Sequence, residues 1–312
     1  MPIEVSDIAT LLLAIGGHYV ADELTCVVGD TGCYHHPLLE ACQVTIRLSC
    51  RNISMYQIHI YGPSAILLTM RQLPDWLTKQ PIAHRGLHDK KLPENSIGAF
   101  KAAIKYGYAI ELDVHLSRDH RLVVIHDDTT KRLTDKDLKV TTTFAADLVE
   151  LRLNKTNSHI PLLDEVLAVV AGSVPLLVEV KTDSRANVIG PELQKILATY
   201  TGDFAIQSFD PRIINWFHIH EPRIIRGQLA YSFKDYPNLS KVQKFLLRTM
   251  LLNVQTRPDF IAYEISSLPH LAVSFWRKVY KMPLLTWTIN TKAELQKARK
   301  LGANVIFEQL RV

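Results

Sequence analysis

The sequence lacks several features that would assign it to a membrane, secreted or nucleic-acid-binding class. None of its apolar runs reaches the roughly 18–20 residues needed to cross a bilayer. The apolar stretch 8–15 has no lysine or arginine before it, so it lacks the charged front of a secretory signal. No long run of lysine and arginine is interleaved with aromatic residues, which argues against a nucleic-acid partner. We therefore expect a soluble, cytoplasmic protein without stable membrane insertion; these patterns leave its oligomeric state open.

Cysteine and lysine are missing from large parts of the chain. All four cysteines lie within the first fifty residues, so no disulfide can link two later segments, and their spacing is not that of a zinc module. Lysine is absent before Lys79. Residues 1–69 contain two basic and six acidic residues, whereas the remaining residues contain 34 Lys and Arg against 25 Asp and Glu. This positive excess suits an anionic ligand.

The change in composition near residue 70 predicts two parts. Residues 1–69 show no sustained hydrophobic period. We expect them to be an N-terminal extension that is either poorly ordered and dispensable, or translated upstream of the true start. Residues 70–312 are expected to form the working domain, and a chain with 47% hydrophobic residues can bury a large core there.

From residue 81 onward, short apolar runs alternate with stretches of helical period. Buried strands that are each followed by a helix indicate a parallel sheet covered on both faces. Eight such units in about 230 residues fit a (β/α)8 TIM barrel, an α/β fold; a doubly wound open sheet is the competing architecture. A further strand is expected at 122–128, within the loop after the second unit. The eight runs are 82–84, 109–114, 175–180, 203–209, 224–230, 259–265, 283–289 and 304–308, and helical stretches include 96–106, 186–200, 239–252, 268–280 and 292–301.

Acidic side chains stand at the ends of two of these runs. Residues two apart on a strand point to the same face, so Glu111 pairs with Asp113, and Glu179 with Lys181. In a TIM barrel the carboxyl ends of the strands form the active-site rim. Three carboxylates gathered there would make a hard oxygen site, which suits Mg²⁺ or Ca²⁺.

Two histidines and two cations complete the expected rim. His84 and His126 each end an apolar run, and an unperturbed imidazole can take up and return a proton near neutral pH. Arg85 and Lys181, together with a metal, would neutralise phosphate oxygens. This combination predicts phosphoryl chemistry. Each motif taken alone is ordinary, because His84-Arg85-Gly86 reads as a turn and Asn95 or Ser96 as a helix cap.

In order along the chain, the motifs resemble the glycerophosphodiester phosphodiesterase family over about residues 78–307. They are HRG (84–86), PEN (93–95), ELDV (111–114), VVIHD (123–127), VEVK (178–181) and WTIN (287–290). The resemblance implies a (β/α)8 barrel that uses a divalent metal to hydrolyse glycerophosphodiesters to glycerol 3-phosphate and an alcohol. The sequence FEQL (307–310) departs from the family's pattern, so no role is assigned to the last strand.

The resemblance also implies a role for each matching residue. The implied roles are general acid and base for His84 and His126, metal ligands for Glu111, Asp113 and Glu179 with Glu94 as a further contact, phosphate binding for Arg85 and Lys181, shaping of the site for Asn95, and a flat wall beside the glycerol or leaving group for Trp287.

Two alternatives stay open at this point. One is a lysophospholipase D that acts on acylated lipids, which would need an apolar channel. The other is a catalytically silent barrel that binds phosphate compounds or a protein partner, although the expected histidines and carboxylates are all present. The sequence also leaves open which histidine is the acid, and whether water or the glycerol 2-hydroxyl attacks phosphorus.

Overall fold

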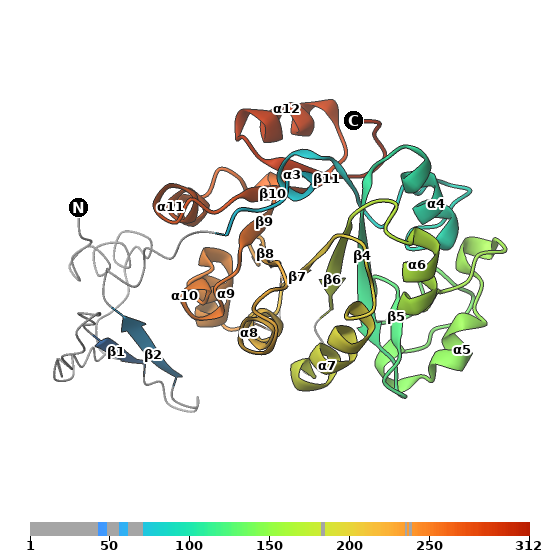
Figure 1. The fold of residues 1–312 in the computed structure, drawn as a ribbon, viewed down its shortest axis with the longest axis horizontal. Helices are drawn as coiled ribbons and strands as arrows, with labels where there is room; N and C mark the ends of the chain where they lie inside the picture. Colours follow the sequence, from blue (N-terminus) through green and yellow to red (C-terminus); the bar gives the residue numbers. More distant parts are fainter. Residues whose placement is uncertain (1–42, 49–55, 62–70, 182–184, 235, 237–238) are drawn as a thin grey trace. The chain divides into compact units, whose positions relative to one another are not determined.

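A computed structural model describes residues 43–48, 56–61, 71–181, 185–234, 236 and 239–312 (Figure 1). The chain divides after Met70 into two units. In the first unit, β1 (Gln43–Leu48) pairs antiparallel with β2 (Tyr56–Tyr61). The cysteines and most of the expected extension 1–69 lie outside the described residues, so its dispensability stays a prediction.

The second unit is a closed barrel of eight parallel strands, which confirms the expected fold. The barrel closes because the first strand pairs with both the second and the last. Each strand coincides with one of the eight apolar runs. The strands are β3 (Ile82–Ala83), β4 (Ala109–Leu116), β6 (Leu176–Val180), β7 (Phe204–Ser208), β8 (Arg226–Ala230), β9 (Phe260–Glu264), β10 (Leu284–Ile289) and β11 (Asn304–Phe307).

The expected extra strand is also present. β5 (Leu122–Val124) pairs antiparallel with the second half of β4. The loop that follows carries α5 (Ala145–Val149) between two short 3-10 turns, η1 (Val140–Thr142) and η2 (Leu153–Lys155). Its apolar side chains form a small core of their own beneath the loop. This loop therefore has a fixed shape, and its first residues reach the rim of the barrel.

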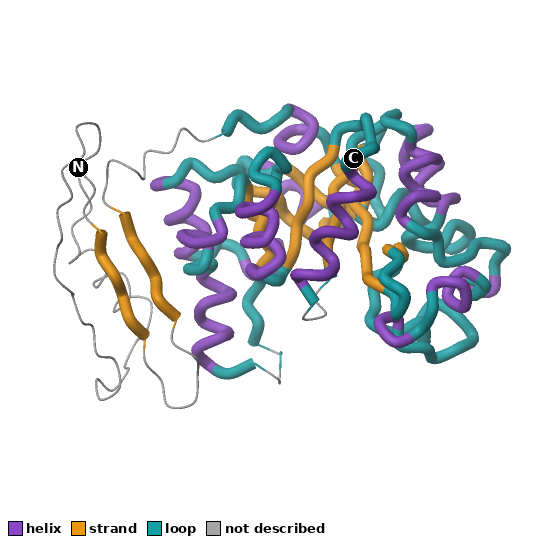
Figure 2. Tube along the Cα trace, turned by 60° about the horizontal axis from the view of Figure 1, so that its bottom comes forward, coloured by secondary structure: helices purple, strands orange, loops and turns teal. Residues whose placement is uncertain are grey.

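Helices surround the strands (Figure 2). The helices expected from the sequence are all present, and several further helices join them. Among the described residues, no helix has the length and apolar character needed to cross a membrane. The remaining elements are α3 (Asp75–Lys79), α4 (Ile97–Lys105), α6 (Leu163–Val170), α7 (Ala186–Leu197), α8 (Pro211–His220), α9 (Lys241–Thr249), α10 (Asn253–Thr256), η3 (Ile265–Ser267), α11 (Leu271–Val279) and α12 (Lys292–Lys300).

The inner positions of the strands change from apolar to polar along the barrel axis. Leu177, Leu285 and Ile306 belong to a buried core that includes Trp76 of α3. Two residues further along come Glu179 and Trp287 on their strands and Glu308 directly after β11, and side chains two apart on a strand share a face. The lower part of the barrel is therefore packed, and the polar side chains collect at its carboxyl end.

Candidate active site

The turn after β3 presents the first site residues. Arg85 and Gly86 both have positive φ, at 54° and 78°. A Cβ on Gly86 would lie 2.9 Å from the backbone of Ala99, so glycine lets α4 pack close to this turn. The backbone N–H of Asn95 donates to the Arg85 carbonyl (2.9 Å), and the Ser96 hydroxyl caps α4 by accepting from Ala99 N–H. The turn after β3 and the start of α4 are thus held together as one local structure.

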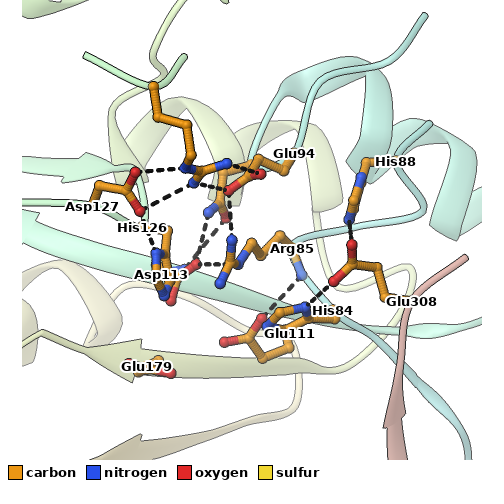
Figure 3. A network of polar contacts seen from close by, with 12 residues as sticks. His84, Arg85, His88, Glu94, Glu111, Asp113, His126, Asp127, Glu179 and Glu308 are labelled. Carbon is orange, nitrogen blue, oxygen red and sulfur yellow. Dashed lines mark hydrogen bonds and ion pairs between the residues drawn. The ribbon is translucent and has the colours of Figure 1, made fainter. Parts of the chain in front are cut away.

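Three carboxylates from the neighbouring strands β4 and β6 lie close together. Glu111, Asp113 and Glu179 are buried and each offers an oxygen within 4.8 Å of the others (Figure 3). The sheet register causes this, because Asp113 lies directly opposite Glu179. Glu111 Oε2 accepts a hydrogen bond from Arg85 N–H (3.0 Å), whereas its buried Oε1 has no hydrogen-bond partner among the described residues.

The pKa values of two of these carboxylates are shifted in opposite directions. Burial and the neighbouring carboxylates raise the pKa of Glu111 well above its ordinary value. Burial would also raise the pKa of Asp113, but Lys181 and Arg85 outweigh it and hold that pKa well below the ordinary value. The buried oxygen of Glu111, beside two further carboxylates, is the donor set that a hard divalent cation takes. The residues present therefore fit Mg²⁺ or Ca²⁺.

Lys181 and Asn95 lie against these carboxylates. Lys181 Nζ is 2.8 Å from Asp113 Oδ1 and donates to Glu179 Oε1, so its ammonium balances two members of the cluster. The Asn95 amide donates to Asp113 Oδ2 at 2.7 Å. Lys181 was expected to bind phosphate, and Asn95 was expected to shape the site for the substrate. Here they fix the orientation of the acids, and Asp113 in particular is held from two sides.

Glu94 lies outside the carboxylate cluster. Its carboxylate accepts from Arg85 Nη1 (2.7 Å) and from both terminal nitrogens of Arg132 (2.7 and 2.8 Å). Arg132 comes from the loop after β5 and also donates to Asp127 (2.6 Å). Glu94 therefore orients two guanidinium groups, and burial is outweighed by these cations, which lower its pKa.

Each of the two histidines is paired with a carboxylate through Nδ1. His84 Nδ1 lies 2.9 Å from Glu308 Oε2, and His126 Nδ1 lies 2.6 Å from Asp127 Oδ1. The hydrogen bond with His84 lowers the pKa of Glu308 to about 2. Burial would raise the pKa of Asp127, but the hydrogen bonds with Arg132 and His126 outweigh it and lower this pKa to about 2. An ionised carboxylate can only accept, so each Nδ1 carries the proton and each Nε2 is left with a lone pair.

Burial keeps both imidazoles neutral at pH 7. It lowers the pKa of His126 to about 4, against the opposing charge of Asp113. It also lowers the pKa of His84, although the hydrogen bond to Glu308 works against it. Two neutral rings in the same tautomer are therefore available for proton transfer.

Both rings line one pocket at the mouth of the barrel. Glu111, Glu179 and Arg85 line it with them, and so does the indole of Trp287. The indole of Trp287 packs edge-on against Phe209, with ring centroids 5.4 Å apart. Asp113, Asn95 and Lys181 stand behind this lining and contact it. The remaining lining residues are Gln207, Phe209, Leu229, Thr288 and Ile306.

Four residues near the site were not assigned a role from the sequence. Glu308 directly follows β11, so its place at a strand's carboxyl end was a usable signal. Asp127 directly follows His126. His88, whose Nε2 is 3.5 Å from Glu308 Oε1, and Arg132 come from loops and carry no periodic signal. The last strand thus contributes Glu308 to the surroundings of a predicted catalytic histidine.

Comparisons with known proteins show which family the chain matches. Residues 84–308 match the glycerophosphoryl diester phosphodiesterase family. The chain is 29% identical over 237 residues to a glycerophosphodiester phosphodiesterase from Caldanaerobacter subterraneus subsp. tengcongensis, covering 72% of this chain and 91% of that protein. A human lysophospholipase D is 28% identical over 147 residues, covering 43% of this chain and 45% of that protein.

A solved structure has the same fold. It is an Oleispira antarctica phosphodiesterase in complex with its product sn-glycerol-3-phosphate, with a TM-score of 0.62 and 24% sequence identity. The match covers 74% of this chain and 93% of the other. The barrel fold is therefore that of a known phosphodiesterase structure.

Proposed function

Because this chain belongs to the glycerophosphoryl diester phosphodiesterase family and is a phosphoric diester hydrolase, we propose that it cleaves deacylated phospholipid head groups to glycerol 3-phosphate and an alcohol. The observation that carries the proposal is the pairing of two neutral imidazoles with a buried three-carboxylate cluster around one pocket. The product named for the Oleispira antarctica relative supports the same reaction.

A divalent cation, Mg²⁺ or Ca²⁺, is the proposed cofactor. Glu111, Asp113 and Glu179 would hold it, and the bound cation would supply positive charge to the phosphoryl oxygens. Glu94 is an unfavourable further ligand, because its oxygens are already hydrogen-bonded to two arginines. Lys181 and Asn95 keep the acids in position for the cation.

The protein's own groups would move the protons. One imidazole removes the proton of the attacking hydroxyl or water through the lone pair on its Nε2 and later releases that proton to solvent. The other imidazole first takes up a proton from solvent on its Nε2, and as an imidazolium it delivers this proton to the oxygen of the leaving alcohol. Glu308 and Asp127 fix the ring orientation and stabilise the imidazolium that forms when a proton arrives. Arg85 would face the phosphate from the pocket wall, and Trp287 would give the glycerol or the alcohol an apolar surface.

The direct test is an assay of glycerol 3-phosphate release. Purified protein is incubated with glycerophosphocholine or glycerophosphoethanolamine in the presence of Mg²⁺, Ca²⁺ or EDTA. We expect release with one of the cations and its loss with EDTA. Release that EDTA leaves unchanged would contradict the metal proposal.

A lysophospholipid in the same assay tests the second candidate function. The similarity to a human lysophospholipase D favours this candidate, but it spans 43% of the chain. The pocket that Trp287 and Phe209 line has a volume of about 60 Å³, so we expect the deacylated diesters to be better substrates than the larger acylated one. The reverse order would identify a lysophospholipase D.

Residues 70–312 are proposed to carry this activity, and the protein is proposed to act in cytoplasmic lipid and glycerol metabolism. The division of the chain after Met70 supports the first part. Expression of 70–312 alone should give soluble, active protein, and loss of either property would show that the preceding residues are needed. Fractionation of the source cells tests the location.

A further inference from the structure

A second cavity opens at the carboxyl ends of β8 and β9. It has a volume of about 540 Å³ and is lined by Lys234, Arg248, Glu264 and His270 together with serine side chains and Tyr231. None of these residues belongs to the catalytic pocket described above. A cavity of this size can hold a substituent of several non-hydrogen atoms.

This cavity adjoins the catalytic pocket through two aromatic rings. Tyr231 lines the cavity and Trp287 lines the pocket, and their ring centroids are 6.3 Å apart. Glu264 and Trp287 are also direct partners in the pairing of β9 with β10. Neighbouring strands lie about 4.7–4.9 Å apart, so the two spaces are separated by only the width of one strand or side chain. A substrate bound by its phosphate can therefore extend from one space into the other.

Positive charge predominates in the cavity. Lys234 and Arg248 are cationic, whereas the one lining carboxylate, Glu264, accepts a hydrogen bond from the Ser267 hydroxyl at 2.6 Å. Burial and the neighbouring Arg248 lower the pKa of His270, so its ring is neutral at pH 7 and keeps one N–H donor. Among the described residues, Arg248 Nε and His270 Nδ1 are buried without a hydrogen-bond partner. Such groups are costly to leave unpaired, and an anionic oxygen would satisfy them.

We propose that this cavity binds an anionic substituent, either a carboxylate or a second phosphate, on the leaving alcohol of the substrate. The proposal rests on the proposed function and adds a preference for one class of glycerophosphodiester. The phosphate to be cleaved lies against Arg85 and the carboxylate cluster, the alcohol crosses Trp287 and Tyr231, and its anionic group reaches Arg248 and Lys234.

Matched substrates measure this preference. Glycerophosphoserine differs from glycerophosphoethanolamine by one carboxylate, and glycerophosphoglycerol phosphate differs from glycerophosphoglycerol by one phosphate. We expect kcat/KM to be at least about tenfold higher for the anionic member of one pair, which corresponds to 1.4 kcal/mol. The pair that shows the preference identifies the anion. Equal values within both pairs would overturn the proposal.

Variants locate the preference in the cavity. Arg248→Gln should reduce the ratio of kcat/KM within the preferred pair about tenfold, and Arg248→Lys should restore part of it. Lys278→Gln, which removes an exposed cation from the outer surface of α11, should leave the ratio unchanged. A ratio that falls equally in the Arg248→Gln and Lys278→Gln proteins would show only a general effect of charge.

A binding measurement separates failure of the cavity from failure of the proposed function. If the protein hydrolyses none of these diesters, the proposed function is wrong and the cavity is tested without turnover. Phosphoserine and phosphoethanolamine are titrated while tryptophan fluorescence is followed. Tighter binding of phosphoserine that Arg248→Gln removes would support the anion site. Equal binding of the two compounds would exclude it.

Discussion

Replacement of Glu308 by glutamine tests whether the last strand orients a catalytic imidazole. The Glu308 carboxylate lies 2.9 Å from His84 Nδ1, and the two side chains are 20% and 12% exposed. Glutamine has almost the same volume, so the surrounding packing is kept. Its NH₂ group can donate to Nδ1, however, which would move the ring proton to Nε2 and remove the lone pair from the reacting nitrogen.

The expected loss follows from the hydrogen bond that is removed. A hydrogen bond with one charged partner contributes about 1.5–3 kcal/mol. If that energy stabilises the imidazolium in the transition state, kcat falls about 10- to 150-fold. KM should change little, because Glu308 is not among the residues that line the pocket.

Steady-state kinetics with glycerophosphoethanolamine measure both constants. Glu150→Gln, a change of the same chemistry at an exposed position on the protein surface, is the matched control and should retain wild-type kcat. The ¹⁵N shifts of His84 report the tautomer directly and should change in Glu308→Gln alone. Wild-type kcat with an unchanged tautomer would refute the orienting role.

Three further predictions concern other parts of the site. His126→Ala should lower kcat about 10²–10⁴-fold, the usual contribution of a positioned proton donor or acceptor, and a near-normal rate would remove this residue from the mechanism. The pKa of His126 is lowered to about 4 in the folded protein, so the unfolded chain takes up a proton first as the pH is lowered. The free energy of unfolding should therefore decrease as the pH is lowered from about 6.5 to 4. Urea unfolding of His126→Asn should show a weaker pH dependence. Glu111→Gln should abolish the rise in Tm that Mg²⁺ or Ca²⁺ gives the wild-type protein, and an unchanged rise would place the cation elsewhere.

The sequence predicted the barrel because parallel strands in this fold are buried on both faces. All eight apolar runs became strands, including the two-residue β3. Among the helices that the sequence did not predict, α6 begins without a side-chain cap, whereas α8 begins with Asp210 and Pro211, a recognisable start signal. Local start signals therefore did not decide which helices were predicted, because α7 and α11 also begin without a side-chain cap and were expected.

The sequence predicted only part of the site, because only the residues on or next to strands carry a periodic signal. The carboxylates and histidines stand at strand ends, where the topology of the barrel determines that they meet. Arg132 reaches Glu94 across 38 residues of sequence from an irregular loop, and no local pattern encodes that contact. Lys181 was expected at phosphate, but whether it contacts substrate or only its neighbouring acids depends on side-chain geometry, which strand periodicity does not specify.

The most direct test of the account is the position of a bound cation in a crystal of this protein. Crystals grown with Mn²⁺ in place of Mg²⁺ allow the ion to be located by its anomalous scattering. We expect a single strong peak within about 2.0–2.6 Å of oxygens from Glu111, Asp113 and Glu179. A cluster that stays empty while Mn²⁺ supports turnover, or a peak at another set of ligands, would contradict it.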